Sequence, residues 1–270
     1  MDNRVGFIGL GDIGTPMARR ILEAGFQVCS SAHRRRNAIE SLKASGLVEV
    51  DSPYDVAKQS DLVATMVVDE AQTDTVLRGP EGALAGLASG SVVIIMSTVS
   101  PEYCKSLAAE SAETGIDILD CPVAGGRPRA ERGALALICG GDSKVLERCR
   151  PILETMGTIF HCGPIGMGQV VKLANNGLVA SQFQLVQEVR AMAEAYEMDL
   201  NALMKIIGQS TGTSFVVENW EFLETNWRHM GRMAKKDIDL CLAAAKAKNV
   251  SMPLVEAACK LAVPWAVSPS

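Results

Sequence analysis

A lysine and an asparagine stand four residues apart near the start of a long helical pattern. Lys172 and Asn176 follow a glycine-rich run, Gly163–Gly168, and lie within Val170–Met198, which contains no proline. Residues at i and i+4 share one face of a helix, so the amine and the amide are expected to face the same site. An amine can exchange a proton with a reacting hydroxyl group, and an amide can hold the hydroxyl oxygen. A lone lysine near a helix start is more often a solvated side chain, so the pair needs support from elsewhere in the chain.

A second candidate site is a G-x-G-x-x-G pattern close to the beginning of the chain. It directly follows the apolar run Arg4–Ile8 and precedes a helical pattern at Thr15–Glu23. In such a loop the first glycine permits a tight turn, the second lets the backbone approach a pyrophosphate, and the third lets the helix pack closely on the sheet. The helix start adds free N–H groups and a positive dipole end. The pattern in this context predicts dinucleotide binding by Gly9, Gly11, Asp12, Ile13 and Gly14.

The residues about 20 positions past the glycines bear on which dinucleotide is bound. A strand expected at Phe26–Ser30 is followed by Ser31-Ala32-His33-Arg34-Arg35, which contains no carboxylate. A carboxylate there would favour NAD, whereas guanidinium groups bind phosphate through bidentate, charge-assisted hydrogen bonds. The sequence therefore predicts a preference for NADP(H), with NAD(H) possible. The candidates for the 2′-phosphate are Ser31, His33, Arg34 and Arg35. The alternative is a solvated run of arginines that opens a helix.

The first half of the chain alternates short apolar runs with helical patterns, which is typical of βαβ units and a parallel sheet. Strands are expected at Arg4–Ile8, Phe26–Ser30, Leu62–Val68, Ser91–Met96, Ile116–Cys121, Ala134–Cys139 and Thr158–Cys162. Helices are expected between them at Thr15–Glu23, Arg35–Ala44, Pro101–Thr114 and Lys144–Thr155.

No strand candidate of comparable strength follows Gly168. Beyond the long pattern at Val170–Met198, helices are expected at Asn201–Gln209, near Val216–Thr225, at Ala234–Lys248 and at Pro253–Val263. The predicted fold class is therefore an α/β Rossmann-type doubly wound parallel sheet followed by an all-α C-terminal domain. We expect a dinucleotide-binding domain at residues 1–164. A helical substrate and dimerisation domain at 165–270 is expected to begin with a long interdomain helix.

The composition excludes several classes of protein. Hydrophobic residues make up 48% and charged residues 21%, typical of a soluble globular protein. No apolar run is long enough to span a bilayer. Because a strand is expected within the first few residues, we expect no signal peptide. The net charge of −5 argues against a general nucleic-acid binder. Eight cysteines without paired spacing indicate reduced thiols in a cytoplasmic compartment and no metal site.

Three further motifs occur later in the chain. They are D-C-P-V-A-G-G at Asp120–Gly126, continuing to Ala130 and Gly133; G-P-I-G-M-G-Q-V-V-K-L-A-N-N at Gly163–Asn176; and K-D-I-D-L at Lys236–Leu240. Together with the N-terminal loop, they resemble, in order, the motifs of the β-hydroxyacid dehydrogenase family within the 6-phosphogluconate dehydrogenase-like superfamily. The resemblance is to the group that contains the 3-hydroxyisobutyrate, threonate and tartronate-semialdehyde (2-hydroxy-3-oxopropionate) enzymes.

The resemblance implies a role for each motif. Lys172 would be the general acid/base and Asn176 would hold the substrate hydroxyl. A small-molecule carboxylate would bind at Val123, Ala124, Gly125 and Gly126. Further cofactor contacts would come from Met66, Val67, Val68, Thr98 and Lys236. The sequence departs from the family at Ala124, where the family has a serine, so one hydrogen bond to the substrate is expected to be lost or supplied by another group. The family also implies a homodimer or homotetramer.

These observations predict an NADP(H)-preferring oxidoreductase that transfers hydride between the nicotinamide and a short β-hydroxy acid or its semialdehyde. One alternative is a reductase of small aldehydes such as glyoxylate or succinic semialdehyde. Imine reductases share the architecture but usually lack the lysine, so Lys172 counts against that activity. Outside the enzymes, the alternative is an NADP(H)-binding sensor or scaffold that kept the fold.

Overall fold

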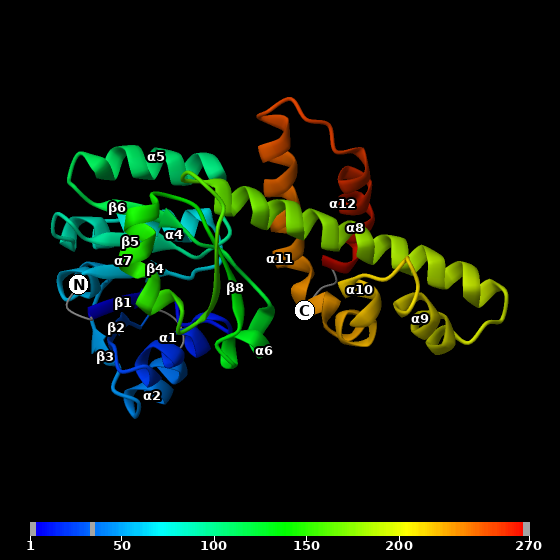
Figure 1. The fold of residues 1–270 in the computed structure, drawn as a ribbon, viewed down its shortest axis with the longest axis horizontal. Coiled ribbons are helices and arrows are strands. Elements are labelled where there is room, and N and C mark those ends of the chain that lie inside the picture. Colours follow the sequence, from blue (N-terminus) through cyan, green and yellow to red (C-terminus); the bar gives the residue numbers. More distant parts are fainter. Residues whose placement is uncertain (1–3, 33–35, 267–270) are drawn as a thin grey trace. The chain divides into compact units, whose positions relative to one another are not determined.

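The computed structural model describes residues 4–32 and 36–266 (Figure 1) and divides into two compact units, Met1–Lys172 and Leu173–Ser270. The predicted boundary at residue 164 lies before helix α8 (Met167–Ala195), whereas the two units divide within this helix. The difference has a physical cause, because the first turn of α8 is hydrogen-bonded to strands and loops of the first unit.

The first unit is built on a six-stranded sheet with the order β3-β2-β1-β4-β5-β6. Its strands are β1 (Arg4–Ile8), β2 (Gln27–Ser31), β3 (Val48–Val50), β4 (Leu62–Thr65), β5 (Val92–Ile95) and β6 (Asp117–Asp120), and all neighbours pair in parallel. The chain thus builds outward from β1 in one direction and from β4 in the other. Ligands of such doubly wound sheets bind at the carboxyl ends of the strands, where the order reverses. The predicted fold class is confirmed.

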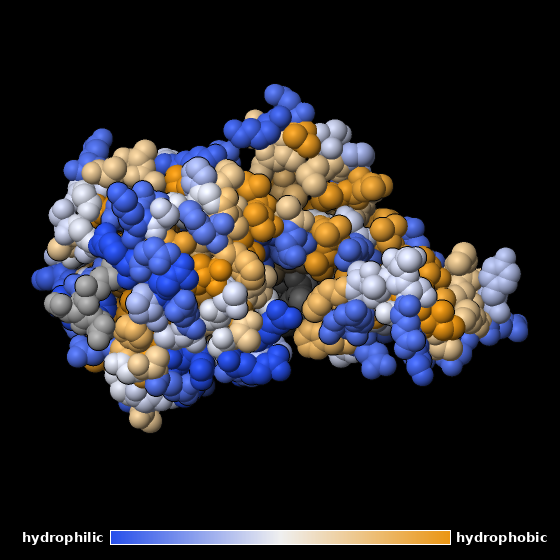
Figure 2. All heavy atoms as spheres, in the orientation of Figure 1, coloured by the Kyte–Doolittle hydropathy of each residue, from blue (hydrophilic) through white to orange (hydrophobic). Residues whose placement is uncertain are grey.

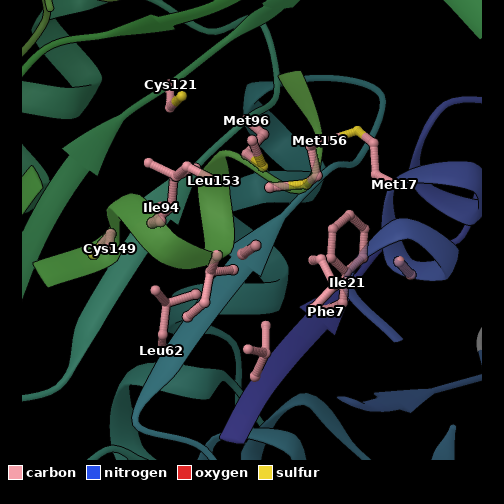
Figure 3. Close-up of a cluster of buried hydrophobic side chains, with 14 of the residues drawn as sticks. Phe7, Met17, Ile21, Leu62, Ile94, Met96, Cys121, Cys149, Leu153 and Met156 are labelled. Carbon is pink, nitrogen blue, oxygen red and sulfur yellow. The ribbon is translucent and has the colours of Figure 1, made fainter. Parts of the chain in front are cut away.

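The buried faces of this sheet explain why its strands are so apolar. Val5 and Phe7 belong to one buried cluster and Ile8 to another, and the same alternation separates Ile94 from Ile95. Successive side chains of a strand point to opposite faces, so a continuous apolar run marks a strand covered by helices on both sides. Figure 3 shows Phe7, Leu62 and Ile94 packed with side chains of the covering helices, among them Met17, Ile21 and Leu153.

The helices of the first unit fill the connections between the strands. They are α1 (Gly14–Glu23), α2 (Arg36–Lys43), α3 (Pro53–Lys58), α4 (Glu70–Arg78), the short 3₁₀ turn η1 (Ala83–Gly86), α5 (Pro101–Ala112), α6 (Gly126–Glu131) and α7 (Ser143–Leu153). The predicted helices at Thr15–Glu23, Arg35–Ala44, Pro101–Thr114 and Lys144–Thr155 correspond to α1, α2, α5 and α7. The sequence did not predict α3, α4 and α6.

The last two predicted strands of the first half do not extend the large sheet. Strands β7 (Val123–Ala124), β8 (Leu135–Cys139) and β9 (Gly157–His161) form a separate sheet in the order β7-β8-β9. Strand β7 pairs antiparallel with β8, and β8 pairs parallel with β9. An antiparallel bridge between Asp120 and Gly140 joins the end of β6 to the end of β8.

The second unit is helical over its described residues. After α8 come α9 (Leu200–Gly208), α10 (Phe215–Glu218), α11 (Trp220–Lys246) and α12 (Pro253–Ala266). One buried cluster gathers around Phe183 and Trp220, whose rings stack with centroids 5.0 Å apart. A second cluster joins Ala180, Ile238, Val255 and Cys259 from α8, α11 and α12. Within the described part of the chain, no helix combines the length and the apolar composition needed to cross a bilayer.

Candidate active site

The glycine loop between β1 and α1 has the conformation that its pattern predicts. Gly9 has a φ of 107°, and a Cβ atom at Gly9 would lie 2.3 Å from the carbonyl oxygen of Met66. A Cβ at Gly14 would lie 2.0 Å from the carbonyl oxygen of Gly9. A Cβ at Gly11 would meet nothing within 4 Å. The fold itself therefore requires the first and third glycines, whereas the space above Gly11 is open.

The N-terminus of α1 is suited to an anionic ligand. Helices α3, α4, α5 and α7 each begin at a residue whose side chain accepts a backbone hydrogen bond, namely Ser52, Asp69, Ser100 and Asp142. Helix α1 begins after Ile13, which has no side chain that could do so, and its first turn contains no acidic residue. Within this turn Pro16 has no N–H, and Thr15 donates its N–H to the carbonyl oxygen of Gly11 at 3.0 Å. The positive dipole end of the helix still favours an anion such as phosphate.

A pocket of about 890 Å³ opens beside this loop, a volume within the range of small-molecule sites. Its walls include Gly11 and Asp12 together with three arginines from three helices: Arg19 of α1, Arg36 of α2 and Arg127 of α6. Arg36 is paired with Glu40 and Glu49, and Arg127 with Glu131 at 2.8 Å. The sequence prediction did not include these three arginines among the cofactor residues. Arg19 follows Thr15 by one helical turn, so helical spacing carried a signal for it.

The residues predicted to recognise the 2′-phosphate are described only in part. Ser31 ends β2 and is half-buried. His33, Arg34 and Arg35 lie outside the described residues.

The loops after β4 and β5 are hydrogen-bonded to each other. The Oγ atom of Ser97 accepts a bond from the backbone N–H of Val67 at 2.9 Å. Met66, Val67 and Thr98 are half-buried, whereas Val68 is 51% exposed. These predicted cofactor residues therefore share one edge of the sheet with the glycine loop, since Met66 also donates its N–H to the carbonyl oxygen of Ile8.

A buried carboxylate caps the start of α8. Asp120, fully buried at the end of β6, accepts the N–H of Gly166 at 2.6 Å through Oδ1 and the N–H of Gln169 at 2.8 Å through Oδ2. Burial raises the pKa of this carboxyl above its usual range, and the backbone hydrogen bonds from Gly166 and Gln169 oppose that shift. A negative charge at a helix start also interacts favourably with the helix dipole.

The side chain of Gln169 makes a second connection at the same helix start. Its Nε2 donates to the carbonyl oxygen of Ser97 at 2.9 Å, and its Oε1 accepts from the N–H of Val99 at 3.2 Å. Gln169 is fully buried. The sequence reasoning missed this residue, because its partners lie about 70 positions earlier and no local pattern points to them.

The predicted substrate loop leaves the small sheet and opens α6. Val123 and Ala124 pair with Leu137 and Ala136 of β8. The loop then turns at Gly125 and Gly126, which have φ values of 126° and 68° and are exposed. Such positive φ values favour glycine, so the loop conformation depends on both residues.

Lys172 and Asn176 both lie on α8 and are half-buried. The Nδ2 of Asn176 donates to Oδ2 of Asp237 at 2.6 Å, and the Nζ of Lys236 lies 3.0 Å from Oδ1 of Asp237. The second unit thus brings together residues of two motifs that are 61 positions apart in sequence. Asp237, 9% exposed, was not among the predicted site residues, and it orients the Asn176 amide.

Among the side chains that the structure describes, no three His, Cys, Asp or Glu residues are grouped closely enough to hold a metal ion. All eight cysteines are free thiols.

The chain matches two protein families in succession. Residues 4–166 match the NAD binding domain of 6-phosphogluconate dehydrogenase, and residues 166–264 match the NAD-binding domain of NADP-dependent 3-hydroxyisobutyrate dehydrogenase. The chain is 33% identical over 264 residues to 2-(hydroxymethyl)glutarate dehydrogenase of Eubacterium barkeri, covering 96% of this chain and 87% of that enzyme. It is 32% identical over 263 residues to an NAD-dependent L-serine dehydrogenase of Pseudomonas aeruginosa, covering 93% and 88%.

Solved structures show the same relationship. The structure of Mycobacterium tuberculosis 3-hydroxyisobutyrate dehydrogenase with L-serine superimposes with a TM-score of 0.86 at 28% identity. The superposition covers 99% of this chain and 95% of the other. Sequence and fold thus agree along almost the whole chain.

Proposed function

The chain belongs to the β-hydroxyacid dehydrogenase family of NAD(P)-dependent oxidoreductases, which act on CH–OH groups, and we propose that it transfers hydride between NADP(H) and a short β-hydroxy acid or the corresponding semialdehyde. Lys172 is the general acid and base of this reaction.

The main support for the proposal is the set of hydrogen bonds at the start of α8. The first turn of the helix is bonded to Asp120 of β6 and to the Ser97–Val99 loop after β5, at the sheet edge that also carries the glycine loop. Lys172 follows Gln169 by three residues and so lies on the same side of the helix. The bound nicotinamide would supply or accept the hydride. The amine of Lys172 would exchange the hydroxyl proton as charge develops on the substrate oxygen.

Asn176 has the donors needed for a second role. A side-chain amide carries two N–H groups, and one of them is donated to Asp237. That bond fixes the amide orientation, and we propose that the other N–H donates to the substrate oxygen. Lys236 is paired with the same carboxylate, and we propose that it contacts the cofactor.

The substrate class follows from the chemistry of the related enzymes. The names 2-(hydroxymethyl)glutarate, L-serine and 3-hydroxyisobutyrate all denote carboxylates with a hydroxymethyl group on the adjacent carbon. We propose that the carboxylate of such a molecule binds the N–H groups of Gly125 and Gly126, with Val123 and Ala124 beside it. The exposed, left-handed turn at these glycines supports this assignment.

Ala124 provides a test of the substrate loop. In the family, the serine at this position is a hydroxyl donor suited to the substrate carboxylate. An added hydrogen bond to a charged group contributes about 1.5–3 kcal/mol of binding free energy. Ala124→Ser is therefore expected to lower the KM for short β-hydroxy acids by about tenfold or more, with little change in kcat. Steady-state kinetics on both proteins measures this change. A raised KM would show that the methyl group itself packs against the substrate.

The preference for NADP(H) rests on charge. The chain has no carboxylate at Ser31–Arg35 after β2, and Arg19, Arg36 and Arg127 surround the pocket beside Gly11. Guanidinium groups favour a cofactor with an additional phosphate. Fluorescence titration with NADPH and NADH tests this preference, and tighter binding of NADH would contradict it.

We also propose that the protein self-associates as a homodimer or homotetramer through its helical unit. Figure 2 shows apolar side chains at the surface of this unit. On α8, Leu178, Leu185, Val189 and Met192 recur with helical spacing and are 38–59% exposed. A continuous exposed apolar stripe is typical of an interface, and a second copy presents the same stripe. Light scattering is expected to report at least twice the 28.7 kDa of one chain, and a monomer at micromolar concentration would contradict this proposal.

A screen of short β-hydroxy acids and semialdehydes with both cofactors tests the proposed function. We expect turnover of at least one such pair, with the higher kcat/KM for NADP(H). Turnover restricted to glyoxylate or succinic semialdehyde would favour a reductase of small aldehydes. Cofactor binding without any turnover would favour an NADP(H) sensor.

A further inference from the structure

Helix α8 has a start that its own residues do not cap. In a capping box, the side chain before the first turn accepts the N–H of the third helical residue, and that residue's side chain accepts the N–H before the turn. In α8 these positions are Gly166, which has no side chain, and Gln169. Both N–H groups are instead donated to the carboxylate of Asp120, which lies more than 40 residues earlier in the chain.

This arrangement leaves the Gln169 side chain available for another purpose. Its amide binds Ser97 and Val99 with both a donor and an acceptor. Ser97 in turn accepts from the N–H of Val67. The start of α8 is thereby connected to the loops after β4 and β5, which carry the predicted cofactor residues Met66, Val67 and Thr98.

The packing around Asp120 leaves little freedom for the helix start. A Cβ atom at Gly168 would lie 2.2 Å from the carbonyl oxygen of Ile138 and 2.7 Å from Oδ2 of Asp120. A Cβ at Gly140 would lie 2.5 Å from Oδ1 of Asp120. The backbone of α8 therefore lies directly against β8 and the end of β6, at a distance that only glycine at these two positions allows.

We propose that Asp120 and Gln169 are positioning residues for Lys172. Asp120 fixes the start of α8 on the sheet, and Gln169 fixes its rotation relative to the Ser97–Val99 loop. Lys172 lies one turn beyond Gln169, so its amine is held at a set position relative to the cofactor loops. This inference rests on the proposed function of Lys172. A displacement of about 1 Å at a reacting group can cost about a hundredfold in rate, so such a connection has kinetic consequences.

The test uses two variants of Gln169 and one control. Gln169→Glu keeps the size of the side chain but cannot donate to the Ser97 carbonyl when ionised, and Gln169→Met keeps its length without either bond. The control is Gln187→Glu, at a half-buried position further along α8 that has no part in the proposed site. Each protein is examined for kcat, KM and the NADPH dissociation constant. Two further measurements do not depend on turnover: hydrogen exchange in the 163–172 segment, and acylation of Lys172 with and without NADPH.

We expect both Gln169 variants to lose about tenfold to a hundredfold in kcat with a shifted pH profile, while the NADPH dissociation constant changes less than about threefold. Hydrogen exchange at 163–172 should accelerate, and NADPH should protect Lys172 from acylation less than in the wild type. Gln187→Glu should behave as the wild type in every measurement.

The inference is overturned if exchange accelerates while kcat and Lys172 protection stay unchanged. It is also overturned if both Gln169 variants fail to fold, because the connection then holds the domain rather than the lysine. A wild type without turnover would contradict the proposed function alone. The acylation and exchange measurements would still decide whether Gln169 positions Lys172.

Discussion

Replacing Lys172 by alanine is expected to lower kcat by about 10²–10⁴-fold, the usual contribution of a general acid or base. The dissociation constant for NADPH should change less than about threefold, because the proposed pyrophosphate site is formed by Gly9–Gly14 and does not include Lys172. Stopped-flow single turnovers with a substrate from the screen, together with fluorescence titration of the cofactor, separate the two effects. The melting temperature should remain close to that of the wild type, since Lys172 is only half-buried.

Two further variants separate charge from proton exchange. Lys172→Arg keeps the positive charge, but a guanidinium does not lose its proton in proteins, so this variant should be as slow as alanine. Lys205→Ala removes an exposed lysine of α9 and should retain wild-type kinetics. An active Lys172→Ala enzyme would refute the assigned role. An active Lys172→Arg enzyme would show that charge alone suffices.

Gly11→Val is expected to weaken NADPH binding by about a hundredfold, or about 2.7 kcal/mol, without lowering the melting temperature. A side chain at Gly11 meets no protein atom within 4 Å, so the fold accommodates it. We propose that the pyrophosphate approaches the backbone through the open space above the loop, and valine would occupy that space. Isothermal titration and thermal unfolding of the same sample measure both quantities.

Gly14→Ala is the matched comparison for Gly11→Val. Its Cβ would lie 2.0 Å from the carbonyl oxygen of Gly9, so the loop or the helix must shift and the melting temperature should fall. If Gly11→Val destabilises the protein as Gly14→Ala does, the second glycine serves the fold rather than a ligand. Wild-type affinity in a stable Gly11→Val protein would remove the pyrophosphate from this loop.

The parts of the fold that were predictable are those with strong local patterns. Strands β4 and β5 are buried on both faces and appear in the sequence as continuous apolar runs. Strand β3 was missed because it has three residues and none is fully buried. Helices α3 and α4 begin after the N-cap residues Ser52 and Asp69, which are helix-start signals present in the sequence. The helices that follow these caps are short, so their apolar periodicity was too weak to predict them. Helix α11 was predicted as two segments, since Gly231 and polar neighbours interrupt its periodicity.

The candidate site was predictable only where its residues lie close together in the sequence. The glycine loop combines a strand, a turn and a helix within about 20 residues, so the sequence pattern alone predicts it. The bonds from Asp120 to α8, and from Asn176 to Asp237, join residues that the sequence separates by 46 to 61 positions. Such contacts depend on strand order and helix packing, which no short motif encodes. The residues predicted from resemblance include Asn176 but omit Asp237, which is hydrogen-bonded to Asn176, and Gln169, which we propose positions Lys172.

Transfer of deuterium from the cofactor to the substrate would be direct evidence for the proposed hydride transfer. NADPH deuterated at the transferable C4 position of the nicotinamide is incubated with the semialdehyde that the screen identifies, and the product is analysed by mass spectrometry. We expect one deuterium on the carbinol carbon of the β-hydroxy acid product, and no such product with Lys172→Ala on the same time scale. Oxidation of NADPH without deuterium in the product, or no oxidation with any semialdehyde, would contradict the proposed reaction.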